Sequence, residues 1–208
     1  MTTPRVLAVL GVAMALTMGI VRARHPSAAE AEKREPAIGV RLKKGDVLPS
    51  FALTTQTHRP FTEAALRGRV TAVTFIYTRC PVPNFCPLMS KGFHQLQREI
   101  EREPALRDAQ LLSVTLDPKF DTPEVLDAYA KHLGADPKRW HFVTGSPAEI
   151  DRLTRAFSIH MEPNGVLIDH TLATAVIDAD GRIVEIWRGN GWTVAEVIAA
   201  LRKAPAVL

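Results

Sequence analysis

The sequence lacks the features that would place it in several common classes of protein. Its net charge of +4 is small, and no basic stripe with interleaved aromatic residues runs along it, which argues against nucleic acid binding. It contains no internal repeat and no low-complexity tract. An Arg-rich and Ser-rich transit peptide is also absent. With these classes set aside, we expect one globular domain with an N-terminal appendage.

Long hydrophobic runs are equally scarce. One uncharged apolar run, residues 6–21, stands near the N-terminus. A membrane-spanning helix typically needs about 20 residues, so the run is short for one. The apolar core of a signal peptide has at most about 15 residues, so the run is long for that. Ala29-Glu30-Ala31 offers a small-residue cleavage site, but it lies far from the run. No cysteine follows the run, which excludes a lipoprotein anchor. We predict an uncleaved membrane anchor, with a cleaved signal peptide as the alternative.

Both interpretations place the rest of the chain outside the cytoplasm. We expect an exported protein, anchored in the bacterial inner membrane, with its domain in the periplasm or outside the cell. The predicted organisation is an anchor or signal segment at residues 1–24, a linker at residues 25–44 that is rich in Ala, Glu, Lys and Arg, and a domain at residues 45–208. Hydrophobic residues make up 46% of the chain, which is enough for a core.

Only two cysteines are present, Cys80 and Cys86, and the chain is organised around them. They follow an apolar and β-branched run at residues 70–77, which predicts a buried central strand. Beyond them, apolar residues recur at helical spacing to about residue 102, which predicts a helix with one apolar face. The thiols should therefore stand between the end of a strand and the start of a helix, where the helix dipole favours a thiolate on Cys86. A structural disulfide is the alternative.

The remaining elements predict the fold. Further strands are expected at residues 110–116, 140–143, 172–177 and 182–187, the last two joined as a hairpin. Helices are expected behind the N-cap residues Thr122, Ser146 and Thr193. The latter two open capping boxes that end at Glu149 and Glu196. This order predicts an α/β, thioredoxin-like fold with a mixed, mostly parallel central sheet, a C-terminal hairpin and helices on both faces.

A soft-metal site needs a third ligand beside two thiols, and the chain has seven histidines. Six of them lie in the linker, in loops or within predicted helices and strands: His25, His58, His94, His132, His141 and His160. His170 immediately precedes the strand predicted at residues 172–177. In a thioredoxin layout the loop before this strand faces the cysteine turn, so His170 is the candidate third ligand. A solvated surface histidine is the plainer alternative.

Three groups of motifs resemble the Sco/SenC family over about residues 45–202. They are FIYTRCP at residues 75–81 with Cys86-Pro87, LDP at 116–118 with DTPE at 121–124, and VLIDHT at 166–171. Members of this family are membrane-anchored, thioredoxin-fold copper proteins that serve assembly of the CuA site of cytochrome oxidase. The resemblance implies that Cys80, Cys86 and His170 are copper ligands. It also implies, as partner, the cytochrome oxidase subunit that carries the CuA site or another copper protein. The family usually has three residues between the cysteines, whereas this chain has five.

The chemistry of the three side chains supports the same metal independently. Two thiolates and one imidazole form a soft set that suits Cu(I), whereas structural zinc prefers a closed set of four ligands. We therefore predict a copper metallochaperone.

Three other functions use the same residues or the same fold. The main alternative is a thiol–disulfide oxidoreductase that keeps a partner's copper-binding cysteines reduced, with Cys80 and Cys86 as its redox pair. A domain with a structural disulfide and an unrelated interaction role is a third hypothesis. Hydroperoxide reduction is disfavoured, because Thr74 stands where that family carries a proline.

Other side chains near these motifs have plainer roles. Asp117 and Asp121 are more simply explained as residues that shape a loop and cap a helix than as an acid–base pair or a calcium loop. Met89 and Met161 offer soft axial ligands, although Met89 falls on the apolar stripe of a helix and suits the core. Asp169 is a candidate to orient the neighbouring imidazole.

Overall fold

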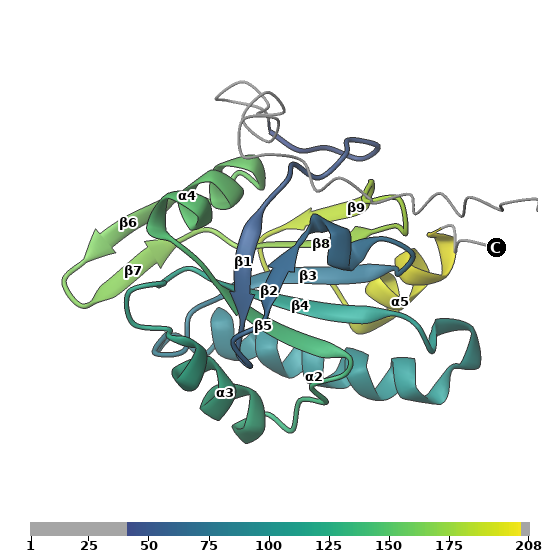
Figure 1. The fold of residues 1–208 in the computed structure, drawn as a ribbon, viewed down its shortest axis with the longest axis horizontal. Coiled ribbons are helices and arrows are strands. Elements are labelled where there is room, and N and C mark those ends of the chain that lie inside the picture. The colour runs from purple at the N-terminus through teal and green to yellow at the C-terminus, as the bar shows by residue number, and fades with distance from the viewer. Residues whose placement is uncertain (1–40, 205–208) are drawn as a thin grey trace, which may run out of the picture.

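The computed structural model describes residues 41–204 (Figure 1). The predicted anchor at residues 1–24 and residues 25–40 of the predicted linker lie outside this range. Among the described residues, no helix is both long and apolar enough to cross a membrane. Leu42 is 3% exposed, and its N–H donates to the Ala156 carbonyl at 2.8 Å. The packed domain therefore already includes residues just before the boundary predicted at residue 45.

A mixed sheet of seven strands forms the centre of the domain, in the order β2-β1-β5-β4-β3-β8-β9. These strands are β1 (Ala52–Thr55), β2 (Pro60–Thr62), β3 (Thr71–Ile76), β4 (Gln110–Thr115), β5 (Trp140–Thr144), β8 (Ala173–Ile177) and β9 (Ile183–Arg188). Only the β3–β4 and β4–β5 pairings are parallel, and the other four are antiparallel. The mixed sheet and the C-terminal β8–β9 hairpin were predicted. The prediction of a mostly parallel sheet is wrong, because β1 and β2, which the sequence did not reveal, add antiparallel pairs at one edge.

Helices cover both faces of the sheet, as predicted (Figure 1). They are α2 (Cys86–Arg102), α3 (Pro123–His132), α4 (Pro147–Ala156) and α5 (Val194–Lys203), with two short 3-10 turns, η1 (Glu63–Leu66) and η2 (Pro104–Leu106). Phe93 of α2 packs against Trp140 of β5, with ring centroids 6.1 Å apart, and α5 contacts α2 on the same side. On the opposite face, Phe157, which follows α4, packs against Phe75 of β3, with ring centroids 4.9 Å apart. The core therefore consists of two apolar layers on either side of a buried sheet.

All three predicted N-caps form, but one of the two predicted capping boxes is incomplete. The Thr122 side chain caps α3, and Thr193 forms a complete capping box with Glu196 at the start of α5. The Ser146 hydroxyl accepts from the Glu149 N–H at 3.2 Å, but the reciprocal half of the predicted box is wrong. The Glu149 carboxylate instead accepts from the Ala52 N–H at 2.9 Å, because β1 brings a backbone donor to it.

A second, two-stranded sheet stands apart from the main one (Figure 1). It consists of β6 (Met161–Asn164) and β7 (Leu167–His170), two strands that the sequence patterns did not predict. Met161 pairs with His170 across this hairpin. The prediction that His170 lies in a loop is therefore wrong in detail, since His170 is the last residue of β7. It still precedes β8, and the hairpin fixes its backbone.

Candidate metal centre

The two cysteines occupy different kinds of backbone. Cys86 is the first residue of α2 and is 0% exposed, with the Tyr77 N–H donating to its Sγ at 3.4 Å. Pro87 follows within the first helical turn, where a missing N–H costs nothing. Cys80 lies in the segment between β3 and α2, here named the cysteine loop (residues 77–85), and is partly exposed. Both thiols are free in the structure.

His170 reaches the cysteines from β7. It is 8% exposed, and its Nε2 lies 3.6 Å from the Cys86 Sγ. Its Nδ1 lies 3.0 Å from the Thr171 carbonyl oxygen, which can only accept a hydrogen bond. A neutral His170 in this geometry carries its proton on Nδ1 and directs the Nε2 lone pair toward the thiols.

The structure brings the three predicted residues together. The Sγ atoms of Cys80 and Cys86 and a ring nitrogen of His170 all lie within 4.8 Å of one another. They come from a loop, a helix start and a strand end that are separate in the sequence. Such a set of two sulfurs and one nitrogen can hold a soft metal ion, and the two sulfurs can also exchange disulfides.

Two aromatic side chains enclose the imidazole of His170. The Tyr77 ring meets it edge-on at a centroid distance of 5.6 Å, and the Phe85 ring does so at 5.5 Å. The Tyr77 hydroxyl donates to the Ile168 carbonyl of β7 at 3.3 Å, and burial raises the pKa of Tyr77 to about 12. Sequence reasoning missed these two roles. The one available signal was that both residues are close neighbours of the cysteines.

The electrostatics of Cys86 differ from the sequence-based expectation. Burial raises the pKa of the Cys86 thiol, and the hydrogen bond from the Tyr77 N–H only partly opposes this effect. The prediction that the helix start favours a thiolate is therefore wrong for the metal-free protein. The cost of desolvating the sulfur outweighs the backbone hydrogen bonds from Tyr77 and Cys86, which favour the thiolate. A metal ion that binds here must displace a proton from Cys86.

His170 has the protonation that a metal ligand needs. Burial lowers the pKa of its imidazole, against smaller opposing effects of the Thr171 carbonyl and of Asp169. The neutral form is the one that can donate its Nε2 lone pair to a metal. Burial therefore has opposite effects on these two ligands, since it favours the ligating form of His170 and the protonated form of Cys86.

The other candidates have structural roles. Asp117 and Asp121 shape the loop between β4 and α3, as predicted, and contact the cysteine loop, while the helix cap comes from Thr122. Met89 is in the core at 2% exposure. The Asp169 carboxylate accepts from the Asn164 side-chain amide at 3.0 Å. The prediction that Asp169 orients the imidazole is wrong, because the Thr171 carbonyl does so.

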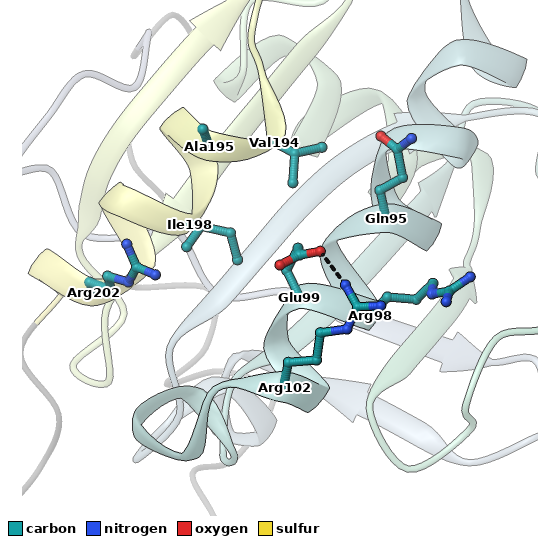
Figure 2. A pocket seen from close by; sticks show the side chains of 8 residues that line it. All are labelled: Gln95, Arg98, Glu99, Arg102, Val194, Ala195, Ile198 and Arg202. Atoms are coloured by element: carbon teal, nitrogen blue, oxygen red, sulfur yellow. Dashed lines mark hydrogen bonds and ion pairs between the residues drawn. The ribbon is translucent and has the colours of Figure 1, made fainter.

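A separate pocket of about 580 Å³ lies between α2 and α5 (Figure 2). It is lined by Gln95, Arg98, Glu99, Arg102, Val194, Ala195, Ile198 and Arg202. Glu99 and Arg102 form an ion pair at its wall, at 2.9 Å. The α2 residues that line it belong to the C-terminal half of the helix, whereas Cys86 is its first residue. The pocket is therefore distinct from the metal centre.

Comparison with known proteins gives a consistent assignment. The family model SCO1/SenC matches residues 40–205. The chain is 29% identical over 183 residues to the mitochondrial SCO1 homolog of Homo sapiens, covering 85% of this chain and 58% of that protein. It is 28% identical to the mitochondrial SCO2 homolog of Bos taurus, covering 85% of this chain and 64% of that protein. The chain thus spans less than two thirds of the length of these relatives.

A solved structure agrees with the family model. The structure of ScoI from Bradyrhizobium japonicum with copper bound is 26% identical, with a TM-score of 0.63, and the similarity covers 78% of this chain and all of that one. Yeast Sco1 with copper bound has the same fold, with a TM-score of 0.64 at 22% identity. By the match over residues 40–205, the chain belongs to the SCO1/SenC family.

Proposed function

We propose that this chain is a copper metallochaperone that holds one copper ion between Cys80, Cys86 and His170. The observation that carries the proposal is the convergence of the three ligand atoms within 4.8 Å of one another. Two thiolates and a neutral imidazole form a soft set that suits Cu(I). The similarity to ScoI from Bradyrhizobium japonicum, which was solved with copper bound, supports the choice of metal.

The accessibility of the site supports delivery rather than permanent storage. Cys80 is partly exposed while Cys86 is buried, so an incoming ligand of a partner can reach the metal from the Cys80 side. The proposed partner is the cytochrome oxidase subunit that carries the CuA site, or another copper protein. Because metal binding displaces the proton of Cys86, proton uptake would accompany release of the metal.

The test is copper binding by the reduced protein. We expect one Cu(I) per chain, measured by competition with a chelator of known affinity. Cys86→Ser should lose tight binding, because a hydroxyl is a poor ligand for a soft metal. Leu88→Ser, which places the same residue type in the same helical turn, is the control and should keep full binding. Full stoichiometry in Cys86→Ser would exclude the proposed site.

A thiol–disulfide oxidoreductase is the second candidate function. The observation in its favour is that both cysteines are free, close together and unequal in exposure. The accessible Cys80 would attack a partner disulfide, and the buried Cys86 would resolve the mixed disulfide. This function needs the thiols but not the imidazole. It is distinguished from copper delivery by the behaviour of His170 variants.

We further propose that the protein is exported and held at the membrane through residues 1–24. The uncharged apolar run at residues 6–21 supports this location. The full chain should then remain with the membrane fraction after cell breakage and resist extraction by high salt. A soluble mature form that begins near Ala31 or Glu32 would show cleavage of a signal peptide instead.

A further inference from the structure

The cysteine loop carries Cys80 between β3 and α2. Five residues separate Cys80 from Cys86, and residues 81–84 are exposed. A longer loop has more conformations to lose when its ends are fixed. Cys86 and His170 belong to a helix and a strand, so the position of Cys80 is the one that depends on how this loop is held.

The start of the loop is tied to a buried carboxylate. The Thr78 N–H and hydroxyl donate to the two oxygens of Asp121, at 3.2 and 2.5 Å. The Thr115 hydroxyl, at the end of β4, donates to the same carboxylate at 2.6 Å. Asp121 is 0% exposed. The Asp121 carboxylate therefore links the start of the cysteine loop, just after β3, to the end of the adjacent strand β4.

A second tie holds the next residue. The Arg79 Nε and a terminal guanidinium nitrogen lie 2.8 and 2.7 Å from one Asp117 oxygen. The guanidinium also stands over the Phe120 ring, 4.6 Å from its centroid, a favourable cation–π position. Two consecutive loop residues are thus bound by one short segment, residues 117–121.

A third tie holds the far end of the loop. The Asn190 side-chain amide, between β9 and α5, donates to the Asn84 carbonyl at 2.9 Å. Inside the loop, the Cys80 N–H donates to the Tyr77 carbonyl at 3.3 Å, and the Phe85 N–H donates to the Val82 carbonyl at 3.1 Å. The loop is therefore folded into two turns and fastened on both sides of Cys80.

We propose that Asp121, Asp117 and Asn190 are positioning residues that hold Cys80 at ligand distance from Cys86 and His170. In this proposal, which rests on the proposed copper binding, the three ties preform a loop that its length would otherwise leave loose. Preformed ligand geometry strengthens binding, because less freedom is lost when the metal arrives. Partners behind the ligands of a metal site commonly change affinity by about 10- to 100-fold.

The decisive variant is Asp121→Asn, which keeps the shape of the side chain. Its amide has one acceptor oxygen where the carboxylate has two, so the Thr78 hydroxyl must either reverse and accept from the amide or lose its hydrogen bond. The hydrogen bonds that remain are weaker, because they no longer involve a charged acceptor. Asp178→Asn is the matched control. Asp178 is 7% exposed and accepts from the Asp180 and Arg182 N–H groups at 2.9 and 2.8 Å. It follows Ile177, which pairs with Thr71 at the start of β3, and so lies at the opposite end of the sheet from the cysteines.

The first measurement is the rate at which Cu(I) leaves the protein for an excess of a strong chelator. Asp121→Asn should release copper about tenfold faster or more, while Asp178→Asn should release it at the parent rate even where it loses similar stability. Asn190→Ala should show a smaller acceleration, because it removes one neutral hydrogen bond. Equal release rates in Asp121→Asn and the parent would overturn the proposal.

The second measurement needs no metal and therefore separates this proposal from the proposed function. In the reduced, metal-free protein, Asp121→Asn should speed hydrogen exchange of the hydrogen-bonded loop amides of Thr78, Cys80 and Phe85 and leave the amides in the middle of α2 unchanged. If the parent binds no copper, the proposed function fails and this measurement still decides whether the loop is held. If Asp121→Asn does not fold, Arg79→Gln replaces it, since Arg79 is exposed. Unchanged loop exchange in the variant that folds would overturn the proposal.

Discussion

At the scale of single residues, His170 distinguishes the two candidate functions. The proposed copper site uses its Nε2, which faces Cys86 at 3.6 Å, whereas disulfide exchange requires only the two thiols. His170→Ala should therefore bind Cu(I) much more weakly and still form and break the Cys80–Cys86 disulfide. Chelator competition measures the first property, and equilibration in a thiol redox buffer measures the second.

The control for this experiment is His160→Ala. His160 lies next to β6, and its side chain is 70% exposed and pairs with Glu162, so its removal should change neither property. Copper binding by His170→Ala at the strength of the parent would show that His170 is not a ligand and would favour the thiol-only function. Loss of both properties would show that the imidazole supports the cysteines rather than the metal alone.

The sequence was sufficient to select Cys80, Cys86 and His170 as the candidates that the structure brings together, because their chemistry is visible in the residue types and motifs. It was not sufficient to find the contacts of Tyr77 and Phe85 with His170, or the hydrogen bonds between Asp121 and Thr78. The Asp121 carboxylate bonds to Thr78, which is 43 positions away in the chain. The sequence does not distinguish a buried aspartate from a solvated one. Asp121 is buried because the β4–α3 loop packs against the cysteine loop, and this packing is visible only in the structure.

At the scale of the elements, the packing of α2 against the Trp192 ring requires a glycine at position 92. A Cβ on Gly92 would lie 2.5 Å from the Trp192 ring, and that ring also meets Phe93 edge-on at a centroid distance of 6.1 Å. On an open helix face, replacing glycine by alanine stabilises by about 1 kcal/mol. Here the clash should dominate, because overpacking costs about 1–3 kcal/mol. We expect Gly92→Ala to lower the free energy of unfolding.

Denaturant unfolding measures the effect of Gly92→Ala. The neighbouring variant Lys91→Ala, at an exposed position of the same helix, is the control and should stay close to the parent, because lysine and alanine have similar helix propensities. A stabilised Gly92→Ala protein would mean that Trp192 can move away at little cost.

The pH dependence of stability should show the effect of His141 on β5. Burial and the nearby Arg69 lower the pKa of its imidazole below the ordinary value, and its ring packs on Phe61 with centroids 5.5 Å apart. As the pH falls below about 6.5, the unfolded chain takes up this proton first. Stability that is present at neutral pH should therefore be lost on acidification. His141→Gln should reduce this loss between about pH 7 and pH 5, measured by denaturant unfolding of the metal-free protein. An unchanged pH profile would contradict the assigned shift.

Sequence patterns located the long elements and missed the short ones. The helices were visible because capping residues and 3.6-residue periodicity mark them, and β3 and β4 because they are apolar or β-branched and fully buried. The strands β1, β2, β6 and β7 have at most four residues each. β2 and β6 each contain a proline, which disfavours a strand assignment. These short strands are stabilised mainly by pairing with neighbouring strands. Three or four residues carry little information about which strand they will pair with.

At the scale of the whole molecule, the metal centre links parts of the fold that are far apart in the chain. The cysteine loop joins β3 to α2, and β7 brings His170 from 84 residues beyond Cys86. The cysteine loop and β7 belong to different parts of the fold, since β7 pairs with β6 in the second sheet. A metal ion held by all three would therefore act as a cross-link within the native state, in addition to serving as cargo.

This cross-linking predicts that copper stabilises the fold. A ligand that binds the native state adds about 2.7 kcal/mol of stability at a free concentration 100 times its Kd. For a chain of this size, about 1 kcal/mol shifts Tm by roughly 2–4 °C, so the expected rise is about 5–10 °C. Calorimetry at a buffered Cu(I) concentration measures it. Because an unfolded chain also offers its two thiols to copper, the informative comparison is with His170→Ala, which retains both thiols. The parent should show the larger rise, since only its native state presents three ligands together. Equal rises in the two proteins would mean that the thiols bind copper independently of the fold, and the preformed three-ligand site would have to be abandoned.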